Sequence, residues 1–206
     1  MPRFLPILMA AVMVFAFAAA PARAETKRYE FDKDHTQILF FADHLGFSKS
    51  EGRFIDFDGH FDFDDAAPEN SAVEVTIKTG SLDMGGGKDR WNEHLKSADF
   101  FNVEKYPDMT FKSTAIKVTG ENMADITGDL TMLGQTHPVV LHTTLNKVGI
   151  FPMNNKHKAG FSATAALDRT QWGMTYGMPM MDPHVEIRIQ VEGSPVDEAE
   201  EGAVNK

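Results

Sequence analysis

The side chains best suited to bind a metal in this 206-residue chain are its histidines. No two of them are separated by three residues, the spacing that places two imidazoles on one face of a helix. The pattern gives little support to a zinc enzyme and favours solvent-facing strand positions for most of the eight: His35, His44, His60, His94, His137, His142, His157 and His184.

Sulfur ligands are concentrated between Gly173 and Pro183, a stretch that holds four methionines and two prolines. Thioether and imidazole groups suit Cu(I). Copper binding is therefore one interpretation of Met174, Met178, Met180 and Met181 with His184. Flexible methionine side chains also fill irregular gaps in a core, which is the alternative interpretation.

No other motif in the chain predicts catalysis. The absence of cysteine excludes disulfides, thiol chemistry, lipoprotein anchoring and Cys-ligated metals. Gly85-Gly86-Gly87 lacks the Lys-Ser/Thr ending of a P-loop. No Ser-His-Asp order or pair of catalytic carboxylates stands out. We therefore expect neither an enzyme nor a cofactor.

The elements that must position these side chains are β-strands. Apolar and polar residues alternate in six segments, each typical of a strand with one buried face: residues 53–64, 73–78, 124–132, 139–145, 161–167 and 185–191. Further segments around residues 29–31, 38–42 and 109–118 bring the total to about nine. The pattern predicts one antiparallel all-β domain, and periodicity alone leaves barrel and sandwich open.

One segment has helical rather than strand spacing. Residues 88–98 carry Trp91 and Leu95 four positions apart and follow the tri-glycine stretch, which predicts a short helix inserted between strands. Arg90 and His94 are also four apart, so they can lie on the same side of this helix.

Five stretches, in order, resemble the YceI family of exported, lipocalin-like bacterial proteins that bind isoprenoids. They are Asp34-His35-Thr36-Gln37-Ile38-Leu39-Phe40 with His44-Leu45-Gly46, Gly52-Arg53-Phe54 with Asp58-Gly59, Arg90 and His94 through Asn102 with Tyr106-Pro107 and Phe111-Lys112-Ser113, Gly128 through Thr136 with Pro138-Val139, and Gly160-Phe161 through Asp168-Arg169 to Gly173. The resemblance covers residues 28–193. It implies an extended eight-stranded antiparallel barrel with a short helical insert, enclosing an apolar pore that holds a polyisoprenoid or similar amphiphile.

The inward apolar faces allow either an ordinary packed core or a tubular cavity, and the resemblance favours the cavity. A long prenyl or acyl chain needs such a tube, because each CH₂ left in water costs about 0.8 kcal/mol. We assign the cavity wall to Phe57, Phe61, Val75, Ile77, Phe111, Leu130, Leu141, Phe161 and Ile187, with Ala163 and Ala165 as small inward residues.

A polar head group would need hydrogen-bond donors near the mouth of the barrel. Guanidinium groups match phosphate or carbonyl oxygens, so we choose Arg53, Arg90 and His94 for this role. The alternative is that both arginines pair with surface carboxylates. The next candidates for the polar end are His35, His44 and Arg169.

The first 24 residues have the three parts of a secretory signal peptide. Arg3 precedes an apolar stretch from Phe4 to Ala20, and Ala22-Arg23-Ala24 is a small-x-small cleavage site. We expect a mature chain that starts at Glu25 and resides in a periplasm, with a retained membrane anchor as the alternative. The barrel domain would span residues 25–196, and residues 197–206 would form an acidic, disordered tail.

The charge balance limits the class of partner. Removing residues 1–24, which hold two arginines and no acid, leaves 18 basic and 30 acidic residues, a net charge of −12. Nucleic acid and anionic membranes are therefore disfavoured. We expect a polyisoprenoid or other amphiphilic lipid as the partner, with a homodimer left open. A copper- or zinc-binding protein and an isoprenoid-modifying enzyme remain the alternative functions.

Overall fold

The computed structural model describes residues 26–196, which form eleven strand segments, one α-helix and three short 3₁₀-helices. The signal peptide expected at residues 1–24 and the tail at 197–206 lie outside the described residues. The strands are β1 (Lys27–Phe31), β2 (Gln37–His44), β3 (Ser48–Phe54), β4 (Phe57–Phe63), β5 (Ala72–Lys78), β6 (Leu82–Asp83), β7 (Asp108–Gly120), β8 (Met123–Met132), β9 (Gln135–Phe151), β10 (Lys156–Asp168) and β11 (His184–Pro195). The helices are α1 (Asp89–Lys96), η1 (Pro68–Asn70), η2 (Thr79–Ser81) and η3 (Arg169–Trp172).

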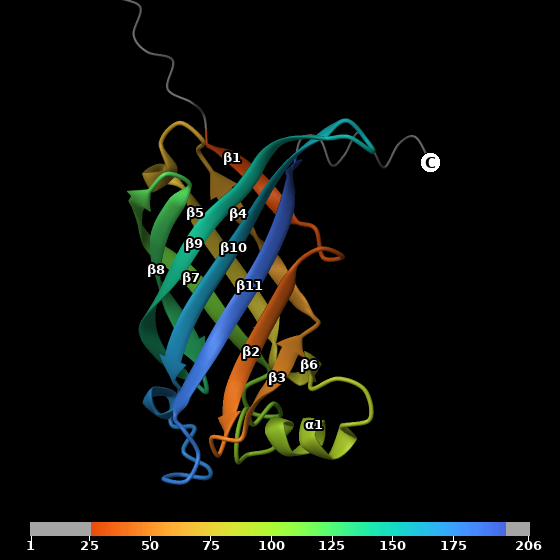
Figure 1. The fold of residues 1–206 in the computed structure, drawn as a ribbon, viewed down its shortest axis with the longest axis vertical. Helices are drawn as coiled ribbons and strands as arrows, with labels where there is room; N and C mark the ends of the chain where they lie inside the picture. The colour runs from red at the N-terminus through yellow and green to blue at the C-terminus, as the bar shows by residue number, and fades with distance from the viewer. Residues whose placement is uncertain (1–25, 197–206) are drawn as a thin grey trace, which may run out of the picture.

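The eleven segments make a closed antiparallel barrel of eight strands (Figure 1). β1 and β2 lie one after the other along the same edge of β11, against residues 193–195 and 185–190, so they act as one interrupted strand. The next strand of the barrel is interrupted in the same way: β4 pairs with β1, and β3 pairs with β2. The strand after it consists of β5, paired with β4, and β6, paired with β3. The β1–β11 pairing closes the ring. The barrel predicted from the family resemblance is therefore confirmed.

The interruption between β3 and β4 changes which residues face inward. Phe54 and Phe57 are both buried although they lie three positions apart, which an unbroken strand would place on opposite faces. Ile55, in the break, is 64% exposed. The expectation of one continuous alternating strand from residue 53 to 64 was therefore wrong at this point.

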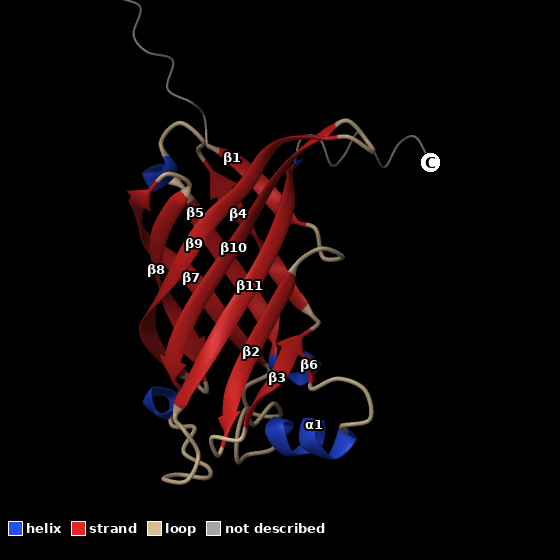
Figure 2. Cartoon of the chain, viewed as in Figure 1, coloured by secondary structure: helices blue, strands red, loops and turns tan. Residues whose placement is uncertain are grey.

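The two ends of the barrel differ in their connections (Figure 2). The lower end in this view carries α1, the β2–β3 turn and the loop of residues 173–183, whereas η1 and the β7–β8 turn lie at the upper end. The helix predicted at residues 88–98 is confirmed in slightly shorter form. No helix in the described part of the chain is both long and apolar enough to span a bilayer.

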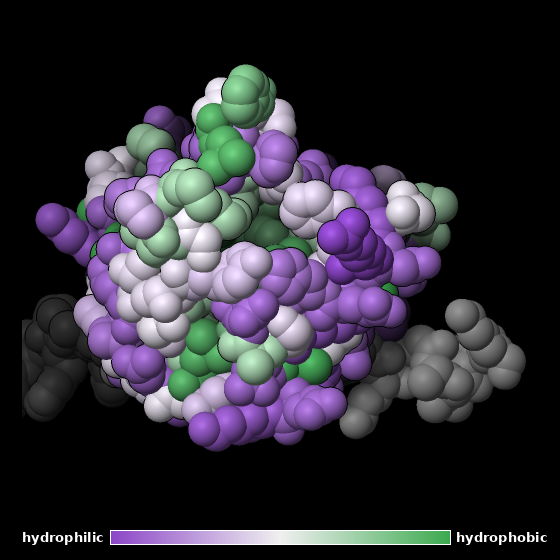
Figure 3. Space-filling view, turned by 90° about the horizontal axis from the view of Figure 1, so that it is seen from below, coloured by the Kyte–Doolittle hydropathy of each residue, from purple (hydrophilic) through white to green (hydrophobic). Residues whose placement is uncertain are grey.

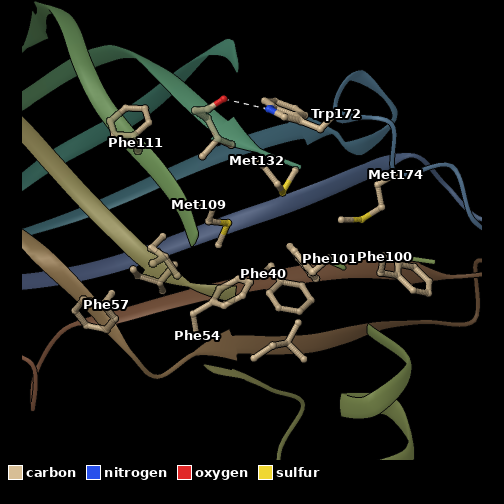
Figure 4. Close-up of a cluster of buried hydrophobic side chains, with 14 of the residues drawn as sticks. Phe40, Phe54, Phe57, Phe100, Phe101, Met109, Phe111, Met132, Trp172 and Met174 are labelled. Carbon is tan, nitrogen blue, oxygen red and sulfur yellow. Dashed lines mark hydrogen bonds between the residues drawn. The ribbon is translucent and has the colours of Figure 1, made fainter. Parts of the chain in front are cut away.

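Aromatic and sulfur-containing side chains fill the lower part of the barrel (Figure 4). Phe40, Phe54, Phe101 and Met109 are buried there, and the Trp172 Nε1 donates a 3.1 Å hydrogen bond to the carbonyl of Leu130. A smaller upper cluster consists of Tyr29, Phe61, Phe63 and Ala159, with Phe161 packed against it. Residues of both clusters line the cavity described below.

Candidate functional site

An apolar cavity of about 390 Å³ runs along the inside of the barrel. Phe101, Arg169 and Met174 line it at the lower end, and Pro68 and Val118 line it at the upper end. Its volume falls in the range of pockets that bind small molecules. The nine residues assigned to the wall from sequence all line this cavity: Phe57, Phe61, Val75, Ile77, Phe111, Leu130, Leu141, Phe161 and Ile187. Their part in ligand binding stays a prediction.

The cavity is lined almost entirely by apolar groups because the strands keep their alternation. On β10, Ala163 and Ala165 point inward and are buried. Thr164, which lies between them, and Ala166, which follows them, are exposed. Ala163 lines the cavity but belongs to neither packed cluster. Its small side chain therefore borders open space rather than a filled core.

The wall of the barrel is incomplete at its upper end. β5 pairs with β7 only where residues 74–78 face residues 108–112, and β7 continues to Gly120 beyond that ladder. Pro68 of η1 and Val118 of β7 both line the cavity there. Val118 is 49% exposed, so this part of the cavity wall also meets solvent.

The three residues chosen for the polar head group do not line the cavity. Arg53 points outward from β3, and its Nη2 donates to Asp83 Oδ2 at 2.7 Å. Arg90 is exposed on α1 and has no ion pair with any described residue. These two placements correct the expectation that both arginines surround the mouth of the barrel. Arg53 lies between inward-facing residues of β3, so its side chain points outward, and α1 lies outside the end of the barrel.

His94 occupies a different position from the one expected. Its Nε2 lies 3.1 Å from Asp99 Oδ2, and its ring packs edge-on against Phe100 and Tyr176 at 5.1 and 5.0 Å. It joins the end of α1 to the loop of residues 173–183 and does not reach into the cavity. His94 therefore holds two connections together at the lower end.

Arg169 is the positively charged side chain among the described residues that line the cavity, and it lies at the lower end. It is 5% exposed, and its Nη1 and Nη2 donate to the carbonyls of Met174 at 2.8 Å and Tyr176 at 2.9 Å. Burial lowers the pKa of this guanidinium, and the negative charges of Asp168 and Asp182 only partly oppose the shift. Sequence reasoning named Arg169 as a reserve candidate; its place at the end of a strand, just before the loop, was the available signal.

The other two reserve candidates lie outside the cavity. His35 Nδ1 is 2.9 Å from Asp32 Oδ2, and the ring of His44 packs edge-on against Trp91 at 6.3 Å. Neither histidine lines the cavity. Arg169 is therefore the one residue of the six polar candidates that does so.

One group of side chains in the described part of the chain has the composition of a metal site. Ligand atoms of Asp32, His35 and Glu192 lie within 4.8 Å of one another. Lys158 Nζ, however, already contacts Asp32 Oδ2 at 2.5 Å and Glu192 Oε2 at 3.0 Å. Burial disfavours the charged forms of Asp32 and Lys158. The hydrogen bonds from Lys158 and His35 nevertheless hold the pKa of Asp32 below its ordinary value. The hydrogen bonds to Asp32 and Glu192 likewise raise the pKa of Lys158. The lysine thus neutralises the carboxylates.

The methionines considered for copper do not share one environment. Met174 is buried in the lower cluster, whereas Met180 is 78% exposed. The Nδ1 of His184 lies 2.8 Å from Asp182 Oδ1. Gap filling accounts for Met174, and the exposed methionines belong to the outer surface of the loop.

The sequence and structural comparisons agree with this geometry. A family model described as a YceI-like domain matches residues 29–193. The chain belongs to the YceI family. A UPF0312 protein of Pseudomonas putida strain GB-1 is 42% identical over 173 residues, which are 83% of this chain and 88% of that protein.

Solved structures share the fold of this YceI-family chain. BcnA of Burkholderia cenocepacia superposes with a TM-score of 0.71 at 23% identity, over 79% of this chain and 98% of BcnA. A polyisoprenoid-binding domain from Saccharophagus degradans superposes with a TM-score of 0.62 at 11% identity, over 81% of this chain and 98% of that domain. At these identities the likeness shows the barrel fold alone.

Proposed function

We propose that this protein binds a polyisoprenoid or a similar long-chain amphiphile inside its barrel, as a carrier or store. The observation that carries this proposal is the elongated cavity of about 390 Å³ with its apolar wall. Each CH₂ moved from water into such a wall gains about 0.8 kcal/mol, so a ligand of ten or more carbons has ample driving force. The solved polyisoprenoid-binding domain with the same fold supports the choice of ligand class.

Binding rather than chemistry suits the groups that line this cavity. Asp62, Asp65 and Arg169 are the charged residues on its wall, and the Asp62 carboxylate is paired with Arg28 at 2.9 Å. A hydrolytic or transfer reaction needs a nucleophile and a base in hydrogen-bond reach of each other. Among the described residues that line the cavity, the hydroxyls of Thr36 and Thr143 donate to main-chain carbonyls and Ser71 Oγ accepts from the Asp64 amide. None of these hydroxyls is hydrogen-bonded to Asp62 or Asp65, and no histidine, lysine or cysteine lies among these lining residues. We therefore infer a binding protein and not an isoprenoid-modifying enzyme.

Arg169 supplies the polar end of the proposed site. A guanidinium has five N–H donors, and the two hydrogen bonds to loop carbonyls leave others for a ligand oxygen. A phosphate, carboxylate or carbonyl head group next to Arg169 would also restore part of the solvation that burial removes. The ligand would then lie with its head at the lower end and its tail along the barrel.

The expected signal peptide indicates the compartment in which this binding takes place. An exported protein meets an aqueous compartment between membranes, where a free prenyl chain would be exposed to water. A barrel that encloses the chain allows the amphiphile to be stored in, or moved through, the periplasm. We include this location in the proposal.

A ligand series tests the proposal. The chain from Glu25 onward, which contains the whole described barrel, is freed of bound lipid and titrated with a prenyl phosphate, the corresponding prenyl alcohol and a straight-chain alkane of similar length. Native mass spectrometry should show one molecule bound per chain. The prenyl phosphate should bind most tightly, and Arg169→Gln should remove that preference while the alkane still binds. Failure of all three ligands to bind would contradict the proposal.

A further inference from the structure

The lower end of the barrel carries an exposed apolar surface, which we call the rim patch. It comprises six of the twelve large hydrophobic side chains that are exposed in the described part of the chain: Leu45, Phe47, Trp91, Tyr176, Met178 and Met180. Phe47 is 88% exposed. Figure 3 views this end and shows apolar groups around a hollow whose floor is also apolar. Such a concentration of exposed apolar side chains is typical of an interaction site.

Aromatic contacts link the three segments that contribute to the rim patch. The ring of His44, next to the β2–β3 turn, packs edge-on against Trp91 of α1 at 6.3 Å. At the other end of α1, His94 packs against Tyr176 of the 173–183 loop at 5.0 Å. The turn, the helix and the loop therefore present their exposed side chains as one surface around the barrel end.

Cations without carboxylate partners lie beside the aromatic part of the rim patch. Lys88 and Arg90 lie at the start of α1, and their side chains have no hydrogen bond or ion pair with any described residue. Lys49 near the β2–β3 turn, by contrast, is paired with Glu186. Lys88 and Arg90 are thus free to approach phosphate groups while Trp91 beside them enters an apolar layer.

The cavity reaches the same end of the molecule, where Phe101 and Met174 line it. If the cavity holds a long-chain amphiphile, as proposed above, that amphiphile must leave and enter a bilayer. We propose that the rim patch docks this end of the barrel on the surface of a zwitterionic phospholipid bilayer. This inference rests on the proposed function. Tryptophan and tyrosine favour the bilayer interface, and the acidic barrel, with its net charge of −10 for the whole chain, disfavours a strongly anionic membrane.

The protein carries its own reporter for this docking. Trp91 is 50% exposed in the rim patch, whereas Trp172, the other tryptophan, is 2% exposed in the core. The chain from Glu25 onward is mixed with phosphatidylcholine vesicles. Its tryptophan emission should shift to the blue, and the protein should float with the vesicles. Trp91→Phe should remove the spectral shift.

Two matched substitutions locate the docking surface. Phe47 in the rim patch and Met153 in the β9–β10 turn at the opposite end are 88% and 84% exposed, so either can be changed without disturbing the core. Phe47→Ser should weaken partition into vesicles about tenfold, because a large apolar group is lost from the bilayer contact. Met153→Ser should leave partition unchanged. Equal weakening by the two variants would overturn the assignment to the lower end.

Two other results would also overturn the proposal. The first is the absence of a Trp91 shift and of flotation at millimolar lipid. The second is a Trp91 shift that follows protein concentration without vesicles, together with a dimer in sedimentation, which would make the rim patch an interface between copies. Lipid loading of the cavity in detergent is measured in parallel. Loading without vesicle docking would refute this inference alone, whereas no loading would refute the proposed function.

Discussion

Ala163→Leu tests whether the cavity is the ligand site. Ala163 lies on β10, lines the cavity and belongs to neither packed cluster, so three added carbon atoms would enter open space. If each carbon takes about the volume of a water molecule, about 30 Å³, the substitution fills roughly a quarter of the cavity. The side chain would then occupy space that the hydrocarbon tail of a ligand needs.

The cost to ligand binding follows from the carbons displaced. Excluding three CH₂ groups of a tail from the apolar wall loses about 2.4 kcal/mol, which corresponds to roughly fiftyfold weaker binding. The free energy of unfolding of the empty protein should stay the same or rise slightly, because the new side chain fills a void instead of crowding a packed core. Binding and stability therefore change independently.

The assay compares Ala163→Leu with Ala166→Leu on the same strand. Ala166 is exposed, so the identical substitution there adds the same atoms outside the barrel. Native mass spectrometry measures retained lipid, displacement of a fluorescent apolar probe gives affinity, and urea unfolding gives stability. If Ala163→Leu folds with unchanged stability and still binds lipid like the parent, the reasoning that places the tail beside Ala163 is refuted.

Three further predictions concern stability. Arg169→Met removes two charge-assisted hydrogen bonds to loop carbonyls and should lower the free energy of unfolding by about 2–3 kcal/mol in urea; a loss below about 0.5 kcal/mol would contradict the buried position. Asp32, with its lowered pKa, should stabilise the fold above its unfolded pKa of about 3.9 and lose that effect as the pH falls through the folded value. Lys158, with its raised pKa, should stabilise the fold at pH values below its unfolded pKa of about 10.4. It should lose that stabilising effect as the pH rises through its folded pKa. Asp32→Asn should therefore flatten the acid limb of a stability–pH profile, and an unchanged limb would exclude this contribution. Gly128→Ala would place a Cβ 2.4 Å from Phe111 Cζ and 2.7 Å from the carbonyl of Lys112, so its melting temperature should fall by several degrees; an unchanged melting temperature would show that the neighbours can move.

The inward faces of the strands could be predicted because a strand alternates with a period of two. Phe57, Phe111 and Ile187 face the cavity for this local reason. Closure of the ring could not be read from periodicity, since the β1–β11 pairing joins residues more than 160 positions apart. The family resemblance provided that information. The break at residues 55–56 was missed because Ile55 and Asp56 continue the alternation of the strand that follows; the adjacent apolar pair Phe54-Ile55 was the available signal.

The polar end of the site was less predictable than its apolar wall. Arg53 and Arg90 were chosen from their types and motif positions, but strand phase and the docking of α1 place both outside the cavity. Arg169 is buried because the following loop folds back and offers the carbonyls of Met174 and Tyr176. That contact depends on the three-dimensional course of the loop, which no local pattern in the sequence encodes.

The most direct test of ligand binding is to identify what the protein carries in its native host. The protein is purified from that host without detergent, weighed by native mass spectrometry and then extracted with organic solvent. We predict one amphiphile with a long prenyl or acyl chain per protein chain, released on unfolding and retained at a clearly lower level by Ala163→Leu. Protein that carries no lipid, or that carries a stoichiometric metal ion and no lipid, would contradict the proposed function.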